Sequence, residues 1–280
     1  MKATLFVLIA LMSVTMLFAG ISHSYYLSTP SFQESEAGIS LKLKGAQSWG
    51  EPGAPDLPWF GVKLLLPEGN EAIGVTVKMS GPISYSLKGK VLPLQRQYPL
   101  SWSGSINADA PDPAIYLSDG AFPKECHNGV QTHFLSGHPI AFTAISPFEY
   151  YPATDELVFY QNLTVDIEFA PTARAFSAMG ILKKDSFTAN RLSASVDNPV
   201  PEYRENRESG VEYLIISDQE KMSNWQPLAD YYEGLGISTQ IVSVSSILSS
   251  TEGSDTQEKI RNSIIATFAA NPLRYVLLAG

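Results

Sequence analysis

Residues 210–280 constrain the fold most strongly, because their apolar pattern switches repeatedly between strand and helix. Three short apolar runs predict strands: 211–216, 237–244 and 274–279. Apolar residues at helical spacing predict two helices between them: Trp225, Leu228, Ala229, Tyr232 and Leu235, then Ile260, Ile264 and Phe268. Asp255 and Glu258 give the second helix a capping-box start. Strands joined through single helices form a parallel sheet with right-handed crossovers.

The carboxyl edge of this sheet is where a site is expected, because open α/β sheets bind ligands outside the carboxyl ends of their strands. Here the ends fall at Ser217 and Asp218, at Ser245 and Ser246, and at Gly280. Asp218 is expected to cap or precede the first helix rather than to bind a ligand. The first turn holds no glycine, which disfavours a dinucleotide site, and no cofactor is predicted. The chain stops on this edge, and we expect the domain to continue beyond Gly280.

The N-terminus has the form of a secretory signal peptide. Lys2 precedes an apolar run at residues 3–19, and a small, polar segment follows. A retained membrane anchor is the alternative, but the run is shorter than the roughly 20 residues that span a bilayer. Cleavage is expected after Ala19 or after Ser24. Ser24 is preferred, which makes residues 1–24 the signal peptide of a secreted or cell-surface protein without a stable membrane span.

Residues 25–175 are predicted to form a β-rich, sandwich-like domain. Short apolar or alternating runs are separated by clusters of glycine, proline, serine and aspartate. The expected strands are 39–43, 60–66, 73–79, 83–87, 91–94, 130–134, 140–145, 157–160 and 163–169. Residues 107–123 are expected to be a loop. The predicted fold is therefore a β domain followed by the start of an α/β domain at residues 211–280.

Residues 176–210 change character and are interpreted as a linker. They are polar and charged, and one short helix is expected near residues 173–179. Arg204 and Arg207 lie in a segment flanked by prolines, just before the first α/β strand. Exposed segments of this kind are preferred sites of proteolytic nicking, so both arginines are candidate processing sites. The alternative is that they are simply solvated charges.

Charge and cysteine content exclude some classes of function. The net charge is −9, and no basic stripe is present to neutralise phosphates, so nucleic acid is a disfavoured partner. Cys126 is the single cysteine, which rules out an intramolecular disulfide.

Cys126 lies beside His127, and a cysteine next to a histidine is a candidate catalytic pair. Neighbours in a strand point to opposite faces, whereas a dyad needs the two side chains to meet, so an incidental thiol is expected. His127, His133 and His138 lie close in sequence, and the last two flank a hairpin-like turn. Zinc would need further ligands, so surface or turn histidines are expected. We assign no catalytic, cofactor-binding or metal-binding residue.

Two parts of the chain resemble a gingipain-type secreted cysteine peptidase of the C25 family, a group of caspase-like proteases. The stretches GEPGAPDLPWFGVKLLLPEG (residues 50–69) and ISPFEYYPATDELVFYQNLTVDIEF (residues 145–169) resemble the family's prosegment. Residues 211–280, from VEYLIISDQ through IRN to RYVLLAG, resemble the opening βαβαβ of its peptidase domain, a three-layer caspase-like α/β fold. The likeness covers nearly the whole mature chain.

The resemblance implies the N-terminal portion of a secreted cysteine endopeptidase zymogen. The family continues its third strand as Leu-x-Gly-Asp, and its catalytic histidine and cysteine lie further downstream, beyond Gly280 here. The resemblance implies thiolate attack on protein or peptide substrates by the longer protein, with the histidine carrying the proton. It also implies a prosegment that contacts the peptidase domain, occludes the site and assists folding. The chain as given is expected to be inactive.

A non-enzymatic alternative is a surface-binding or adhesion module built on the β-sandwich. Trp49, Trp59 and Trp102 could stack on sugars if they are exposed, although packing within the sandwich is the simpler expectation. A small nucleotide-binding α/β domain is a third alternative. It has too few strands and no phosphate loop, and a three-stranded sheet would leave an uncovered edge.

Overall fold

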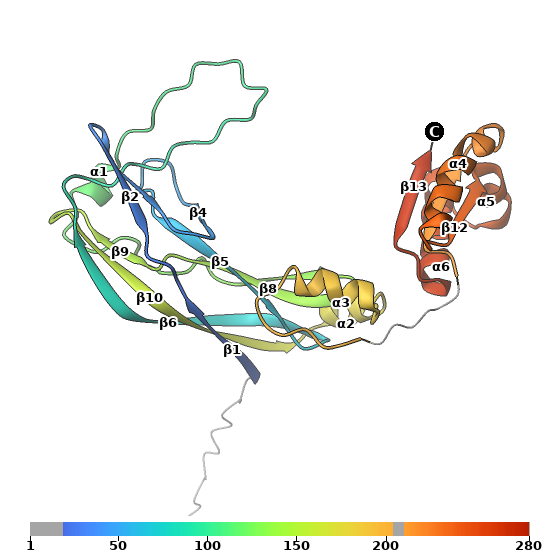
Figure 1. Cartoon of the computed structure of the whole chain (residues 1–280), viewed down its shortest axis with the longest axis horizontal. Helices are drawn as coiled ribbons and strands as arrows, with labels where there is room; N and C mark the ends of the chain where they lie inside the picture. The colour runs from blue at the N-terminus through green and yellow to red at the C-terminus, as the bar shows by residue number, and fades with distance from the viewer. Residues whose placement is uncertain (1–18, 204–209, 280) are drawn as a thin grey trace, which may run out of the picture. The chain divides into compact units, whose positions relative to one another are not determined.

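The computed structural model describes residues 19–203 and 210–279 (Figure 1). They fall into two compact units, the first ending at Tyr203 and the second beginning at Arg204. We call the described parts unit 1 (residues 19–203) and unit 2 (residues 210–279). Within these ranges, no helix is both long and apolar enough to cross a membrane.

Unit 1 is built mainly from strands. Its elements are β1 (Ala19–Tyr26), β2 (Ser31–Ser35), β3 (Gly38–Lys42), β4 (Ala46–Ser48), β5 (Pro58–Leu65), β6 (Asn70–Ser86), α1 (Pro113–Tyr116), β7 (Gln131–Leu135), β8 (His138–Ile145), β9 (Phe148–Tyr151), β10 (Glu156–Pro171), α2 (Ala173–Met179) and α3 (Ser186–Ser193). Most predicted runs lie within these strands. Helix α1 lies in the segment expected to be a loop, where Asp112 caps it and Pro113 starts it.

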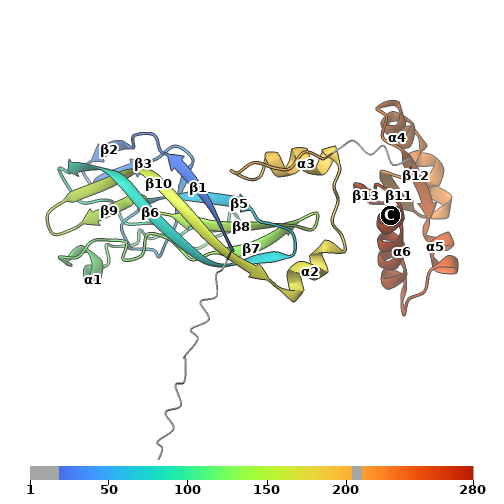
Figure 2. The ribbon, with the colours of Figure 1, turned by 90° about the horizontal axis from the view of Figure 1, so that it is seen from below.

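Two antiparallel sheets pack face to face in unit 1, which confirms the predicted sandwich (Figures 1 and 2). In the first, β10 has β6 along one edge and β1 and β9 along the other. The second sheet has the order β4-β5-β8-β7, and β2 and β3 form a separate hairpin. Strand β10 is the centre of the first sheet, because it pairs along nearly its whole length on both sides.

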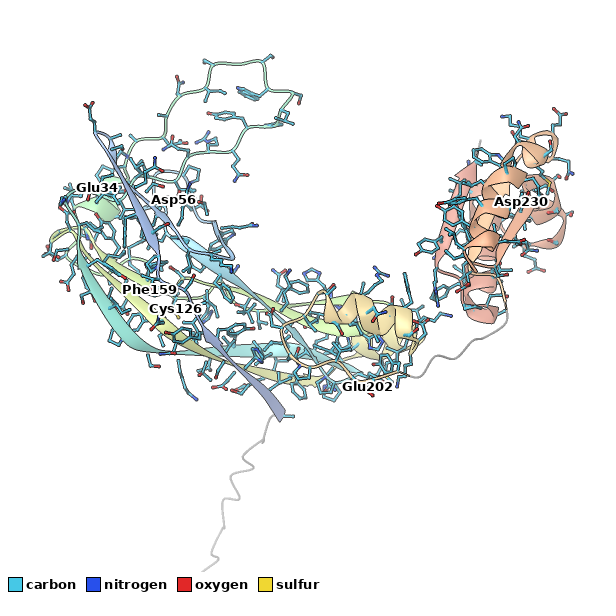
Figure 3. All side chains as sticks on the ribbon, viewed as in Figure 1. Glu34, Asp56, Cys126, Phe159, Glu202 and Asp230 are labelled. Carbon is cyan, nitrogen blue, oxygen red and sulfur yellow. The ribbon has the colours of Figure 1, made fainter. Side chains whose placement is uncertain are left out.

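The core of unit 1 lies between these sheets. Apolar side chains from both contribute to it, and the fully buried ones include Leu64, Ile145, Phe148, Phe159, Leu163 and Val165. Phe159 is labelled in Figure 3 within this sandwich. Alternation along β10 accounts for the pattern, since every second residue of Leu157–Ile167 faces the core while its neighbours face outward.

The long strands differ from the sequence prediction. The predicted runs 73–79 and 83–87 are one strand, β6, and the runs 157–160 and 163–169 are one strand, β10. Gly81 and Pro82 suggest the end of a strand in the sequence. In the structure Gly81 adopts a φ of +67° within β6, and the pairing of β6 with β10 continues on both sides of it. Residues 91–94, predicted as a strand, make only isolated bridges, such as the one between Ile39 and Val91.

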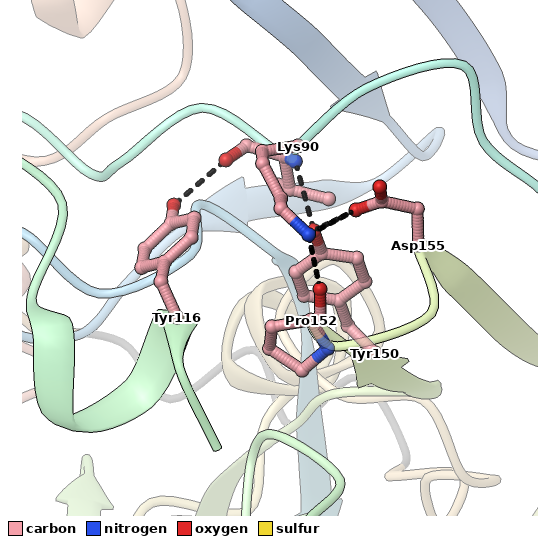
Figure 4. Close-up of polar contacts among 6 residues, drawn as sticks. Lys90, Tyr116, Tyr150, Pro152 and Asp155 are labelled. Atoms are coloured by element: carbon pink, nitrogen blue, oxygen red, sulfur yellow. Dashed lines mark hydrogen bonds and ion pairs between the residues drawn. The ribbon is translucent and has the colours of Figure 1, made fainter. Parts of the chain in front are cut away.

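A polar cluster fixes that bridging segment (Figure 4). The Lys90 Nζ atom lies 2.9 Å from Asp155 Oδ1 and also donates to the Pro152 carbonyl. The Tyr150 hydroxyl donates to Asp155 Oδ1 at 3.2 Å and accepts from the Val91 N–H at 3.2 Å. These contacts tie the segment after β6 to the turn between β9 and β10.

Residues 172–203, which we call the strap, are packed against the second sheet rather than forming an open linker. The helix expected near 173–179 is confirmed as α2, but α3 was not predicted. Leu192 on α3 is fully buried against Leu65 and Ile140. The Asn198 side chain accepts from the Leu65 N–H at 2.7 Å and donates to the Leu65 carbonyl at 3.0 Å. Asn198 therefore covers part of the edge of β5 beyond β4, as a short strand would. Arg204 and Arg207 lie outside the described residues.

Unit 2 contains β11 (Tyr213–Ser217), η1 (Gln219–Lys221), α4 (Met222–Gly234), β12 (Thr239–Ser243), α5 (Val244–Ser250), α6 (Thr256–Ala270) and β13 (Tyr275–Ala279). The three strands form a parallel sheet in the order β12-β11-β13, as predicted. Helix α4 packs on one face and α5 with α6 on the other. Asp255 caps α6 by accepting from the Glu258 N–H at 2.7 Å. Helix α5 was not predicted, because its serine-rich sequence has a weak apolar pattern.

Candidate functional site

The carboxyl ends of the three strands of unit 2 meet at one edge of the sheet. Ser217 at the end of β11 is in register with Ser243 of β12 and with Ala279 of β13. The predicted edge is therefore confirmed, with one correction: β12 ends at Ser243, because Ser245 and Ser246 belong to α5. The strand order changes direction at β11, so the crevice beside its carboxyl end is the expected ligand position in such a sheet.

Serine hydroxyls organise one side of this edge. Ser243 Oγ accepts from the Ser246 N–H at 3.2 Å and thereby caps α5. Ser243 and Ser245 share a hydrogen bond of 3.1 Å between their hydroxyls, and Ser245 donates to Gln219 Oε1 at 3.4 Å. These contacts link the start of α5 to η1 and fix two of the loops that border the edge.

Ser217 is the most unusual residue of the edge. Its side chain is fully buried, and its Oγ atom has no hydrogen-bond partner among the described residues. A buried hydroxyl without a partner costs roughly 1–3 kcal/mol, so the edge suits a further polar group that could bond to it. The sequence placed Ser217 at the edge but gave no signal for its burial.

Asp218 precedes η1, as expected, but its side chain caps no helix. Its carboxylate instead forms an exposed ion pair of 3.4 Å with Lys221, which contributes little to stability. Gly280, the last predicted residue of the edge, lies outside the described residues.

Cys126 belongs to unit 1 (Figure 3), whereas this edge belongs to unit 2. Its backbone lies in a bend, where the Cys126 carbonyl accepts from the Ser146 N–H at 2.8 Å and the neighbouring His127 forms an isolated bridge with Ile145. Burial raises the pKa of the thiol, and the nearby carboxylates of Glu125 and Glu149 raise it further. A raised pKa reduces the thiolate fraction that a nucleophile needs, which supports the interpretation of Cys126 as an incidental thiol.

The three clustered histidines have separate roles. His127 accepts through Nδ1 from the Gly129 N–H at 3.1 Å, and the His133 ring packs edge-on against Phe142 at 5.2 Å. His133 and His138 flank the β7–β8 turn, as predicted. His138 is not a surface residue, however, because its side chain is only 1% exposed. Its Nε2 atom donates to the Lys183 carbonyl at 2.8 Å, so it is buried by the strap, which lies far from it in sequence.

Comparison with known proteins places both units. Residues 31–188 match the C25 propeptide model, and residues 206–280 match the model described as Peptidase family C25. The chain belongs to peptidase family C25. The two C25 segments occur in the order of a zymogen, propeptide first, so the chain is the N-terminal part of a cysteine peptidase precursor. A comparison with curated protein sequences gives no match.

Two solved C25 structures are similar to this chain. One is the complex of the Porphyromonas gingivalis RgpB pro- and mature domains, at 17% identity and a TM-score of 0.45, covering 55% of this chain and 79% of that one. The other concerns the zymogenic latency of gingipain K from Porphyromonas gingivalis, at 22% identity and a TM-score of 0.44. It covers 55% of this chain and 88% of that one.

The C25 peptidase segment of this chain contains neither histidine nor cysteine. The four histidines and the one cysteine of the whole chain all precede residue 206, at His23, Cys126, His127, His133 and His138. The edge around Ser217 thus belongs to a C25 peptidase fold, but residues 206–280 supply no thiol and no imidazole for the reaction.

The tryptophans of the C25 propeptide segment divide into packed and exposed residues. Trp59 is buried, as expected for a tryptophan that packs within the sandwich. The Trp49 ring lies edge-on against the Trp59 ring, with 4.7 Å between their centroids, and about half of the Trp49 surface is exposed. Trp102 is also half exposed and lies against Tyr98 at 5.3 Å. Trp59 thus packs within the domain, whereas Trp49 and Trp102 each lie partly at the surface beside one other aromatic ring.

Proposed function

We propose that this chain is the front of a secreted cysteine endopeptidase zymogen that cleaves proteins or peptides. Unit 1 is its prosegment, and unit 2 begins its peptidase domain. The catalytic histidine and cysteine are expected beyond Gly280. The carboxyl edge around Ser217 borders the place where they would act, because strands that extend this sheet would end on the same side.

One observation carries this proposal. The break between the units, at Tyr203 and Arg204, falls between the end of the propeptide match at residue 188 and the start of the peptidase match at residue 206. The boundary between the two units thus agrees with the boundary between the two family matches, which supports the proposed division into prosegment and peptidase domain.

Latency follows from the same division. We propose that unit 1 contacts the peptidase domain within one molecule and keeps it inactive until the chain is cut. Export through the N-terminal signal sequence would place this activation outside the cytoplasm. Arg204 and Arg207 are the proposed processing sites, because a cut there leaves the strap attached to unit 1, where Leu192 and Asn198 already hold it.

The activity test uses the 280-residue chain and a mixture of fluorogenic peptide substrates. No hydrolysis above background is expected, and Cys126→Ala should change nothing. Activity that disappears in the Cys126→Ala variant would overturn the proposal, because it would show a working nucleophile inside the prosegment.

The processing test uses limited digestion with a protease that cuts after arginine. The chain is expected to separate into two stable fragments at residue 204 or 207, as read by mass spectrometry. A variant with both Arg204→Ala and Arg207→Ala should resist this cut. A control variant with Lys183→Ala and Lys184→Ala should still be cut by the same protease. First cleavage within the strap would contradict the proposed boundary.

A further inference from the structure

Strand β1 begins at Ala19, inside the segment that the sequence assigns to the signal peptide. It pairs with β10 without a break, from Ala19 opposite Phe169 to Tyr26 opposite Asn162. Cleavage after Ser24, the position that the local sequence favours, would leave only Tyr25 and Tyr26 of this ladder. Most of β1 would then be absent from the mature protein.

The side chains of β1 take part in the folded domain. On the inner face, Ile21 and Tyr25 pack against the main core of unit 1, and the His23 ring contacts the Tyr25 ring at 4.8 Å. On the outer face, the Ser24 and Thr164 hydroxyls are 3.0 Å apart. The Ser22 hydroxyl donates a hydrogen bond to the Asp166 carboxylate. This hydrogen bond is the largest of the effects that lower the pKa of Asp166. Cleavage after Ser24 would remove all of these contacts except those of Tyr25.

Tyr25 also connects β1 to the strap. Its hydroxyl donates to Asp197 Oδ2 at 2.9 Å, and the same oxygen accepts from the Lys63 N–H at 2.8 Å. The Tyr25 ring packs edge-on against Phe60 of β5 at 5.2 Å. A new N-terminus at Tyr25 would put a charged α-amino group directly beside this junction. A cut at Ala19 would place that charge where the strand is exposed.

Without residues 20–24, β10 would present an open edge along residues 164–168. Unpaired strand edges of this kind are templates for aggregation, and natural domains avoid them. Within unit 1, β6 already occupies the opposite edge of β10 and β9 pairs only with residues 156–159. Strand β1 is therefore the segment that fills the remaining edge.

We propose that the signal peptide is removed between Ala19 and Gly20, so that the mature prosegment begins with β1. The inference rests on the proposed export of the chain. A signal peptidase hydrolyses the Ala19–Gly20 bond, which leaves a carboxylate on Ala19 and an α-amino group on Gly20. Ala19 supplies the small residue immediately before the cut, whereas Leu17, two positions earlier, departs from the A-x-A pattern; the pairing of β1 therefore carries the assignment. Both Ala19 and Gly20, on either side of this cut, are exposed, and Ile21 is the first residue of β1 that packs against the core.

The direct test is N-terminal sequencing of the chain exported from a bacterial host. Gly20 is the expected first residue. A first residue of Tyr25 or His23 would overturn the cleavage site while leaving the proposed export intact. A chain that retains Met1 would overturn both, so the two failures are distinguishable.

Two matched substitutions sharpen this test. A bulky residue before the cut blocks signal peptidase, so Ala19→Phe should accumulate unprocessed precursor. Ser24→Phe should be processed as before, with Gly20 first. The reverse pattern, in which Ser24→Phe blocks processing and Ala19→Phe does not, would overturn the proposal.

A stability measurement tests the structural reason independently. Two chains are compared, one starting at Gly20 and the other at Tyr25, each after an initiating methionine. The shorter chain is expected to show a thermal midpoint for unit 1 that is lower by about 5 °C or more, together with greater aggregation. Equal thermal midpoints and equal solubility of the two chains would show that the domain does not need β1. The structural argument for cleavage before Gly20 would then fail.

Discussion

The two units differ in how completely each one covers its own sheet. In unit 1, β10 is paired on both edges, and Leu163 on it is fully buried. In unit 2, the central strand β11 is equally buried, but β13 beside it leaves Val276 40% and Leu278 64% exposed. Within residues 210–279, β13 pairs only with β11. Unit 1 therefore covers the apolar side chains of its central strand more completely than unit 2 covers those of β13 within residues 210–279.

The same substitution in each unit should give the largest contrast. Leu163→Ala in β10 is expected to cost about 2–5 kcal/mol, because it removes a fully buried side chain from a closed core. Leu278→Ala in β13 should cost less than about 1 kcal/mol, since most of that side chain is already in contact with water. Hydrogen exchange measured by mass spectrometry reports the stability of each unit separately. Equal losses of exchange protection in the two variants would contradict the difference between the units.

Removal of a strap contact should give a smaller effect that stays within unit 1. Asn198→Ala loses both hydrogen bonds to Leu65 and is expected to cost about 1–2 kcal/mol. Asn190→Ala, on the exposed side of α3, is the control and should change stability by less than about 0.5 kcal/mol. Urea unfolding of both variants measures the difference. An Asn198→Ala variant as stable as the control would show that the strap does not support the β5 edge.

The smallest expected effect is confined to alkaline pH. Burial raises the pKa of Tyr150 from 10.0 to about 12, with the Asp155 carboxylate adding to the rise. Between these values the unfolded chain releases the phenol proton while the folded chain keeps it. Stability is therefore complete below pH 10 and falls as the pH rises toward 12. Tyr150→Phe should flatten this fall, as followed by thermal unfolding of unit 1 from pH 9 to 12. An unchanged dependence of stability on pH in the Tyr150→Phe variant would show that another group causes the fall.

Sequence patterns identified the strands whose periodicity is local, and they failed where distant segments decide the structure. The runs in β5 and β8 alternate or are wholly apolar, so they were found directly. Strand β1 was hidden, because its small and polar residues match the end of a signal peptide equally well. His138 was expected to be a surface or turn residue. It does flank the β7–β8 turn, but the strap, whose Lys183 carbonyl accepts its hydrogen bond, buries it.

The candidate edge was predictable in position but not in detail. Alternating strands and helices fix which ends of parallel strands meet, so Ser217 was placed correctly before the structure was known. The burial of its hydroxyl depends on tertiary packing, which no local pattern reports. The extent of β12 was also misjudged, because Ser243 caps a helix that the serine-rich sequence does not suggest.

The pairing of β1 with β10 has a consequence for the order in which the chain folds. Ser24 and Thr164, which are neighbours in the sheet, are 140 positions apart in sequence. The first strand to be synthesised is thus among the last to find its partner, since β10 is complete only at Pro171. Contacts between such distant segments slow folding, because a long loop must close before they form. A sandwich that closes this late would keep the chain extended for longer, which agrees with the export proposed above.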